Sequence, residues 1–128
     1  TYPQLLLEAL KEYSFYLDRF PSMVVGDFNC HIGQSGVRKS TGTFEDCIAE
    51  MECHGLRSLY HEQTNEKFGE EKTPTFFWQF NQEKPFFLDY AFCTMKPISF
   101  KIGDWEREIS DHRPLIIELE EEPWDDRP

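Results

Sequence analysis

Apolar residues in the first part of the chain recur at helical spacing. Leu6, Leu10, Tyr13 and Leu17 are separated by four, three and four residues, so they share one side of a helix over residues 4–18. A proline lies just before this stretch and another follows it, and both positions are typical of helix limits. The pattern predicts one amphipathic helix at the start of the chain.

A second helix is predicted from the residues at its ends. Thr43 is followed three residues later by Asp46, which is a capping-box pattern. Gly55 is typical of the residue that follows a helix. Ile48 and Met51 provide the apolar side of the segment between them.

Alternating and aromatic-rich runs predict strands in much of the remaining chain. The predicted strands cover residues 22–25, 56–60, 74–80, 86–93, 98–102 and 114–119. A short polar turn at 81–85 separates the third and fourth strands, which we expect to form a hairpin. The polar segments 31–42 and 61–73 are expected to be loops.

These elements predict an α/β protein of the α+β kind, with two helices and about six mostly antiparallel strands. We find no internal repeat and no linker that would divide the chain, so residues 1–119 are expected to form one domain. Residues 120–128 form an acidic tail that we expect to be frayed.

Composition and charge narrow the possible functions. The 128 residues include 12 Phe, 5 Tyr and 3 Trp, which suits a strand-rich core. The formal net charge of −11 disfavours binding along an extended nucleic acid, because such a surface is normally basic. It does not exclude a metal-dependent enzyme, because bound cations supply positive charge locally.

The cysteines also bear on function. Cysteines occur at positions 30, 47, 53 and 93, and none forms a Cys-x-x-Cys pair. Reduced thiols are the rule in the cytosol, so we expect a cytoplasmic protein. Cys30-His31 and Cys53-His54 do not have the spacing of a common zinc site. No apolar run approaches the length of a membrane-spanning helix.

A polar cluster follows the first predicted strand. Asp27 and Asn29 come directly after the strand and Gly26. An aspartate can bind a metal or hold a water, and an asparagine can donate to an anionic oxygen. The same residues are also typical of a simple turn, so the cluster alone leaves both interpretations open.

Two further clusters occur at the ends of later strands. Asp89 stands within an apolar strand, where a carboxylate is costly unless it is paired. His112 is the best candidate partner, because an aspartate bonded to one ring nitrogen leaves the other nitrogen free for chemistry. Asp111 precedes it. Asp89 could instead form a purely structural ion pair, and Asp111 could form a turn or cap. Three such clusters in one small chain nevertheless favour a shared site.

Four short motifs together resemble the endonuclease/exonuclease/phosphatase superfamily. They are Gly-Asp-Phe-Asn at residues 26–29, Pro-Thr-Phe-Phe-Trp at 74–78, Leu-Asp-Tyr-Ala-Phe at 88–92 and Ser-Asp-His-Arg-Pro-Leu at 110–115. Their order and rough spacing match that family from about residue 5 to residue 119. The resemblance implies one half of a two-layer β-sandwich with helices on its outer face.

The resemblance also implies hydrolysis of a phosphoester with a divalent metal, Mg²⁺ or Mn²⁺. By motif, Asp27 would position the attacking water and Asn29 would hold a phosphate oxygen. Asp89 would orient His112, which would contact the scissile phosphate or transfer a proton, and Asp111 would lie beside the metal with Asp27. The substrate could be a nucleic acid, a phosphoinositide, a sphingolipid head group or a small phosphoester.

Arg38 and Lys39 form a small basic spot in the loop after the first cluster. Such a pair is usually only solvated surface, but Arg38 is also a candidate contact for a substrate phosphate.

The chain resembles only the second half of that family, and the family's main metal-binding glutamate has no counterpart in a matching motif. One hypothesis is therefore an enzyme whose other half is elsewhere, and the alternative is a non-catalytic half-domain for binding or assembly. An aromatic sheet face would be left uncovered, which predicts a homodimer or a complex with a separate N-terminal half. The candidates for this face are Phe76, Trp78, Phe80, Phe87 and Phe92, depending on which alternate set of strand residues faces inward.

Overall fold

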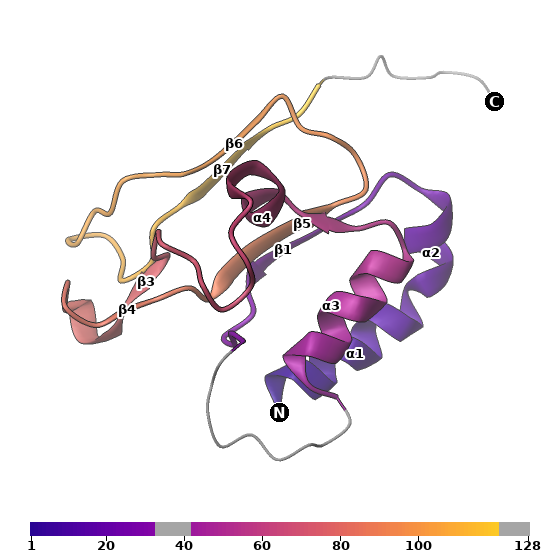
Figure 1. Ribbon diagram of the computed structural model, residues 1–128, viewed down its shortest axis with the longest axis horizontal. Helices are drawn as coiled ribbons and strands as arrows, with labels where there is room; N and C mark the ends of the chain where they lie inside the picture. Colours follow the sequence, from indigo (N-terminus) through magenta and orange to yellow (C-terminus); the bar gives the residue numbers. More distant parts are fainter. Residues whose placement is uncertain (33–41, 121–128) are drawn as a thin grey trace.

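The computed structural model describes residues 1–32 and 42–120. It confirms the α+β class: seven strands in antiparallel sheets and four α-helices occur in the described part of the chain. Two helices lie side by side at one end of the molecule, and the strands lie toward the other end, with a short helix among them (Figure 1). The strand count is close to the prediction, whereas the number of helices is twice the number predicted.

The N-terminal helical segment is divided into two helices. Helix α1 spans Tyr2–Glu12 and α2 spans Ser14–Arg19. The single helix predicted over 4–18 is wrong at Tyr13, whose φ of −95° and ψ of 11° depart from helical values. Leu10 and Leu17 are buried as the periodicity requires, but Tyr13 is exposed because the break turns it away from that side.

The sheet that carries the candidate site has three strands in the order β1–β5–β2. Strand β1 spans Met23–Asp27, β2 spans Arg57–Ser58 and β5 spans Asp89–Cys93, with all pairs antiparallel. All five residues of β5 are buried because it is the central strand. The register places Asp27 directly opposite Asp89.

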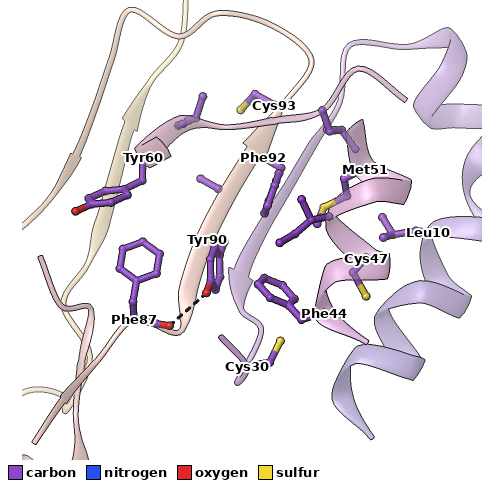
Figure 2. Packing of buried hydrophobic residues seen from close by; sticks show 14 of the residues in the cluster. Leu10, Cys30, Phe44, Cys47, Met51, Tyr60, Phe87, Tyr90, Phe92 and Cys93 are labelled. Carbon is purple, nitrogen blue, oxygen red and sulfur yellow. Dashed lines mark hydrogen bonds between the residues drawn. The ribbon is translucent and has the colours of Figure 1, made fainter. Parts of the chain in front are cut away.

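Helix α3 spans Phe44–Cys53 and begins with the predicted capping box. The Thr43 hydroxyl accepts a hydrogen bond from the Asp46 N–H, and the Asp46 carboxylate accepts one from the Thr43 N–H. The helix packs beside α1 and against β5 (Figure 1). Figure 2 shows Phe44 and Met51 of α3 facing the aromatic side chains of β5.

Helix α4 spans Leu59–Thr64, where the sequence predicted the end of a strand and the start of a loop. The expected strand over 56–60 is reduced to the two residues of β2. The short alternating run is compatible with either element, and the helix ends at Asn65, which adopts the left-handed conformation with φ of 60°. The helix buries Tyr60 and His61.

The expected hairpin of strands 74–80 and 86–93 is only partly present. Strands β3 (Phe76–Phe77) and β4 (Pro85–Phe86) pair over two residues each. Beyond β3 the chain forms the short 3-10 segment η1 (Trp78–Phe80), in which Gln79 and Phe80 have positive φ values. After β4 the chain leaves the hairpin and joins the β1–β5–β2 sheet as β5.

Strands β6 (Ser99–Ile102) and β7 (Leu115–Glu118) form an antiparallel pair, close to the strands predicted there. Phe100 lies opposite Ile117, and both belong to the hydrophobic core or pack against it. The β6–β7 pair thereby brings the segment just before β7 to the start of β5, where Asp89 lies.

Two of the aromatic residues expected on an uncovered face are in the core instead. Phe87 and Phe92 are only 7% and 0% exposed, because α3, α4 and the loop after α4 cover that side of β5. Phe92 stacks against Phe28 and Phe68. Phe76 is half-buried.

The capping box of α3 provides a test of this local structure. Replacing Thr43 by alanine is expected to lower the free energy of unfolding by about 1 kcal/mol, because the first turn loses its side-chain acceptor. Urea denaturation followed by circular dichroism measures the change. Thr43→Ser keeps the hydroxyl and should retain most of the stability. Equal losses in the two variants would show that the cap does not stabilise the protein.

Candidate functional site

Three of the predicted site residues converge at one end of the central sheet. Asp27 ends β1 and Asp89 begins β5, and their register places both side chains on the same face. His112 lies three residues before β7 and forms an isolated bridge with Phe76 of β3. Side chains from three motifs far apart in the sequence therefore meet.

Asp89 is buried and paired as predicted. Its two carboxylate oxygens accept from His112 Nδ1, at 2.8 and 3.1 Å. Burial raises the pKa of Asp89, and hydrogen bonds from Thr75 and His112 oppose that rise. The Asp89 carboxylate thus fixes the Nδ1 side of the imidazole, which leaves Nε2 on the other side of the ring.

The Nε2 atom of His112 faces two more carboxylates. It lies 3.5 Å from Asp27 Oδ2 and 3.9 Å from Asp111 Oδ1. These are longer than ordinary hydrogen bonds, and the side chains of Asp27 and Asp111 are 46% and 38% exposed. One side of the histidine is therefore buried and fully bonded, while the other faces two acidic groups that solvent reaches.

The loop that carries His112 is held in place by residues to which the sequence had assigned no role. The His112 N–H donates to Ser110 Oγ at 3.0 Å. The Arg113 N–H donates to the Thr75 carbonyl at 2.7 Å, and the Arg113 side chain donates to the Gly103 carbonyl at 2.7 Å. Arg113 therefore positions the histidine through the backbone. The sequence signal that could have indicated this role is Thr75, a polar residue at the start of an aromatic run, and the structure buries it fully.

The stretch after β1 is both a turn and part of the site. Asn29 has a φ of 51°, and its N–H donates to Asp27 Oδ1 at 2.8 Å. This is an Asx turn, which holds one oxygen of the Asp27 carboxylate and leaves Oδ2 toward His112. The contact that defines Asn29 here is a backbone contact, so its predicted side-chain contact with a phosphate stays a prediction. Arg38 lies outside the described residues.

Three side chains of the site could together hold a metal ion. Asp27, Asp89 and His112 each offer a ligand atom, and these atoms all lie within 4.8 Å of one another. Carboxylate oxygens are the ligands that Mg²⁺ and Mn²⁺ prefer. Among residues 1–32 and 42–120, no glutamate joins this group. The cluster can therefore hold a metal, but with few protein ligands.

Two other histidines make close contacts with carboxylates. His54, at the end of α3, contacts Asp18 and Glu50, and the Asp18 hydrogen bond is the main cause of its raised pKa. His61 is buried in α4, with Ser58 Oγ 2.6 Å from Nδ1 and Glu71 2.7 Å from Nε2. Neither arrangement was predicted from the sequence.

The pKa shifts of Asp89 and Asp46 predict that protein stability depends on pH in opposite directions. Burial raises the pKa of Asp89 above its ordinary 3.8, so the folded state binds this proton more tightly than the unfolded chain. Hydrogen bonds from the Thr43 and Gly42 backbone lower the pKa of Asp46 below 3.8.

Relative to Asp89→Asn, the wild type should lose stability as pH rises through the folded pKa of Asp89. Relative to Asp46→Asn, it should gain stability as pH rises from the folded pKa of Asp46 toward 3.8.

Unfolding by urea at a series of acidic pH values measures both differences. Each variant serves as the control for the other, because both remove one negative charge. If the difference in stability between the wild type and each variant changed with pH in the same direction for both variants, burial would not be disfavouring the charged form of Asp89.

Comparison with known proteins does not supply a function. No protein-family model matches the chain, and no curated protein matches it significantly. Within the described residues, no helix has the length and apolar character needed to cross a membrane. The function is therefore argued from the geometry around His112.

Proposed function

We propose that this chain carries part of the active site of a metal-dependent phosphoesterase of the endonuclease/exonuclease/phosphatase kind. The observation that supports this most is the convergence of Asp27, Asp89 and His112 from three separate motifs. A chance resemblance of short motifs does not require their side chains to meet. Their meeting at one sheet end fits a site that handles a phosphate group.

The burial and the contacts of each side chain indicate its role in the proposed reaction. Asp89 is buried and bonded to His112 Nδ1, so it orients the imidazole ring. His112 Nε2 faces the open side, where it can donate a proton to a phosphate oxygen or a leaving group. Asp27 is exposed beside it and can orient a water for in-line attack. Asn29 would bind a phosphate oxygen.

Of the acidic side chains around His112, Asp27 and Asp111 would hold Mg²⁺ or Mn²⁺ on the open side of the ring, and Asp89, which is bonded to His112 Nδ1, would complete the group from the buried side. A bound cation would neutralise negative charge on the phosphate oxygens. The protein's net charge of −11 fits a small or single-stranded phosphoester better than a long duplex. All four cysteines are free, which fits a reducing compartment and a cytoplasmic location.

A second function, a non-catalytic half-domain for binding or assembly, is favoured by one observation. No glutamate of the described residues joins the acidic cluster, although the resemblance implies a glutamate as the main metal ligand. In this case Asp89 and His112 would act as a structural ion pair.

Hydrolysis of bis(4-nitrophenyl) phosphate with Mg²⁺ or Mn²⁺ distinguishes the two functions. We expect metal-dependent hydrolysis by the wild type, and loss of about 100-fold in Asp27→Asn and His112→Gln. Glu52→Gln, an exposed carboxylate change on α3, is the matched control and should keep the activity. A wild-type chain without metal-dependent hydrolysis would reject catalysis by this chain alone and favour the binding module.

The proposal that this chain carries only part of an active site also predicts that the protein assembles with a second layer. Val25 is exposed, and it lies on the face of β1 that carries Asp27, because alternate strand residues share a face. Ile116 of β7, Trp78 and Phe80 are exposed as well. We propose that a second layer covers these exposed apolar side chains, supplied by another copy of the chain or by a separate N-terminal half.

Multi-angle light scattering of the pure chain at micromolar concentration tests this assembly. We expect a homodimer, and Val25→Lys should shift it toward monomer because it buries a charge in the interface. Lys101→Gln, an exposed change on β6, is the control. A well-folded wild-type monomer with cooperative unfolding would contradict the homodimer.

A further inference from the structure

A cavity lies away from the candidate site. Its volume is about 610 Å³, and it opens beside Cys93, at the opposite end of β5 from Asp89. The walls come from β2, α4, the chain between β5 and β6, and the start of β6. This volume falls within the range of about 300–1,000 Å³ that is typical of small-molecule sites.

The inner wall of this cavity is apolar. Leu59, Cys93 and Phe100 line it, and all three are buried in the fold. Burial raises the pKa of the Cys93 thiol, which therefore stays neutral at physiological pH. Met95 and Pro97 add further apolar surface from the chain that follows β5. An apolar ligand body would thus be removed from water here.

The rim of the cavity is charged. Arg57 and Lys96 both line it and are exposed, whereas Glu62 is the acidic residue among the lining side chains. Arg57 and Glu62 approach only to 3.5 Å, and both side chains are more than half exposed. Such a contact contributes little and leaves the guanidinium available to another anion. In a protein with a net charge of −11, this rim is locally basic.

We propose that this cavity binds an amphipathic small molecule with an aliphatic body and a carboxylate head. The aliphatic chain packs against Leu59, Cys93 and Phe100, and the carboxylate meets Arg57 and Lys96 at the rim. The two parts of the ligand correspond to the two parts of the cavity. A small inorganic anion would leave the apolar wall wet, and a neutral hydrocarbon would leave the cationic rim unused.

The proposal does not depend on the phosphoesterase function, because none of the lining residues belongs to the His112 site. The cavity and that site lie at opposite ends of the same buried strand. Ligand binding and hydrolysis can therefore be measured separately.

Methyl-labelled methionine provides a local readout. The chain has three methionines, of which Met95 lines the cavity, Met51 is in the core and Met23 is on β1. Titration with decanoate below its micelle concentration should shift the Met95 methyl signal saturably and leave the Met51 signal in place. The Met95→Leu variant identifies the signal. An unchanged Met95 signal, or equal shifts of all three methyl groups, would overturn the proposal.

Two comparisons test the role of charge. Decanol has the same chain without the carboxylate and should bind at least about fivefold more weakly. Arg57→Gln and Lys96→Gln should each weaken decanoate binding, whereas Lys84→Gln, in the turn before β4, should not. Equal binding of decanol and decanoate, or equal weakening in Lys84→Gln, would overturn the proposed recognition of a carboxylate.

Discussion

The side chain of Asp89 belongs to a strand in which every residue is buried, and the candidate site follows from the need to compensate it. A neutral polar group without partners in such a place costs about 2–7 kcal/mol, and an ionised carboxylate costs more. Its charge is met by His112 across two short contacts to Nδ1. Because the histidine is not part of the same sheet, that pairing fixes the position of a second segment against the first.

The need to hold Asp89 against His112 also explains how the small sheets are joined. Thr75 is fully buried, and its hydroxyl oxygen accepts from the backbone N–H groups of Leu88 and Asp89 at 3.0 and 3.2 Å. Its carbonyl accepts from the Arg113 N–H. One threonine before β3 thus connects the start of β5 to the loop before β7. The β3–β4 hairpin is short, but the threonine just before it holds the loop of His112 in position.

The pairing of Asp89 could be predicted because the sequence shows a charged residue inside an apolar run. A buried charge is tolerated only where a partner compensates it. The α3 cap could also be predicted, since Thr43 and Asp46 satisfy each other within one turn. The break at Tyr13, the helix from Leu59 and the burial of Phe87 and Phe92 could not. Each depends on packing between distant segments, which periodicity over a few residues does not contain.

The three paired histidines show why only one of them is a candidate for chemistry. His54 and His61 have partners close to both ring nitrogens, so neither has a free side on which to act. His112 is held closely at Nδ1, while the groups facing Nε2 lie 3.5 and 3.9 Å away. These long contacts join a fixed ring to two exposed carboxylates. A histidine oriented on its buried side and loosely approached on its open side can exchange a proton with a ligand, whereas one bonded at both nitrogens stabilises the fold.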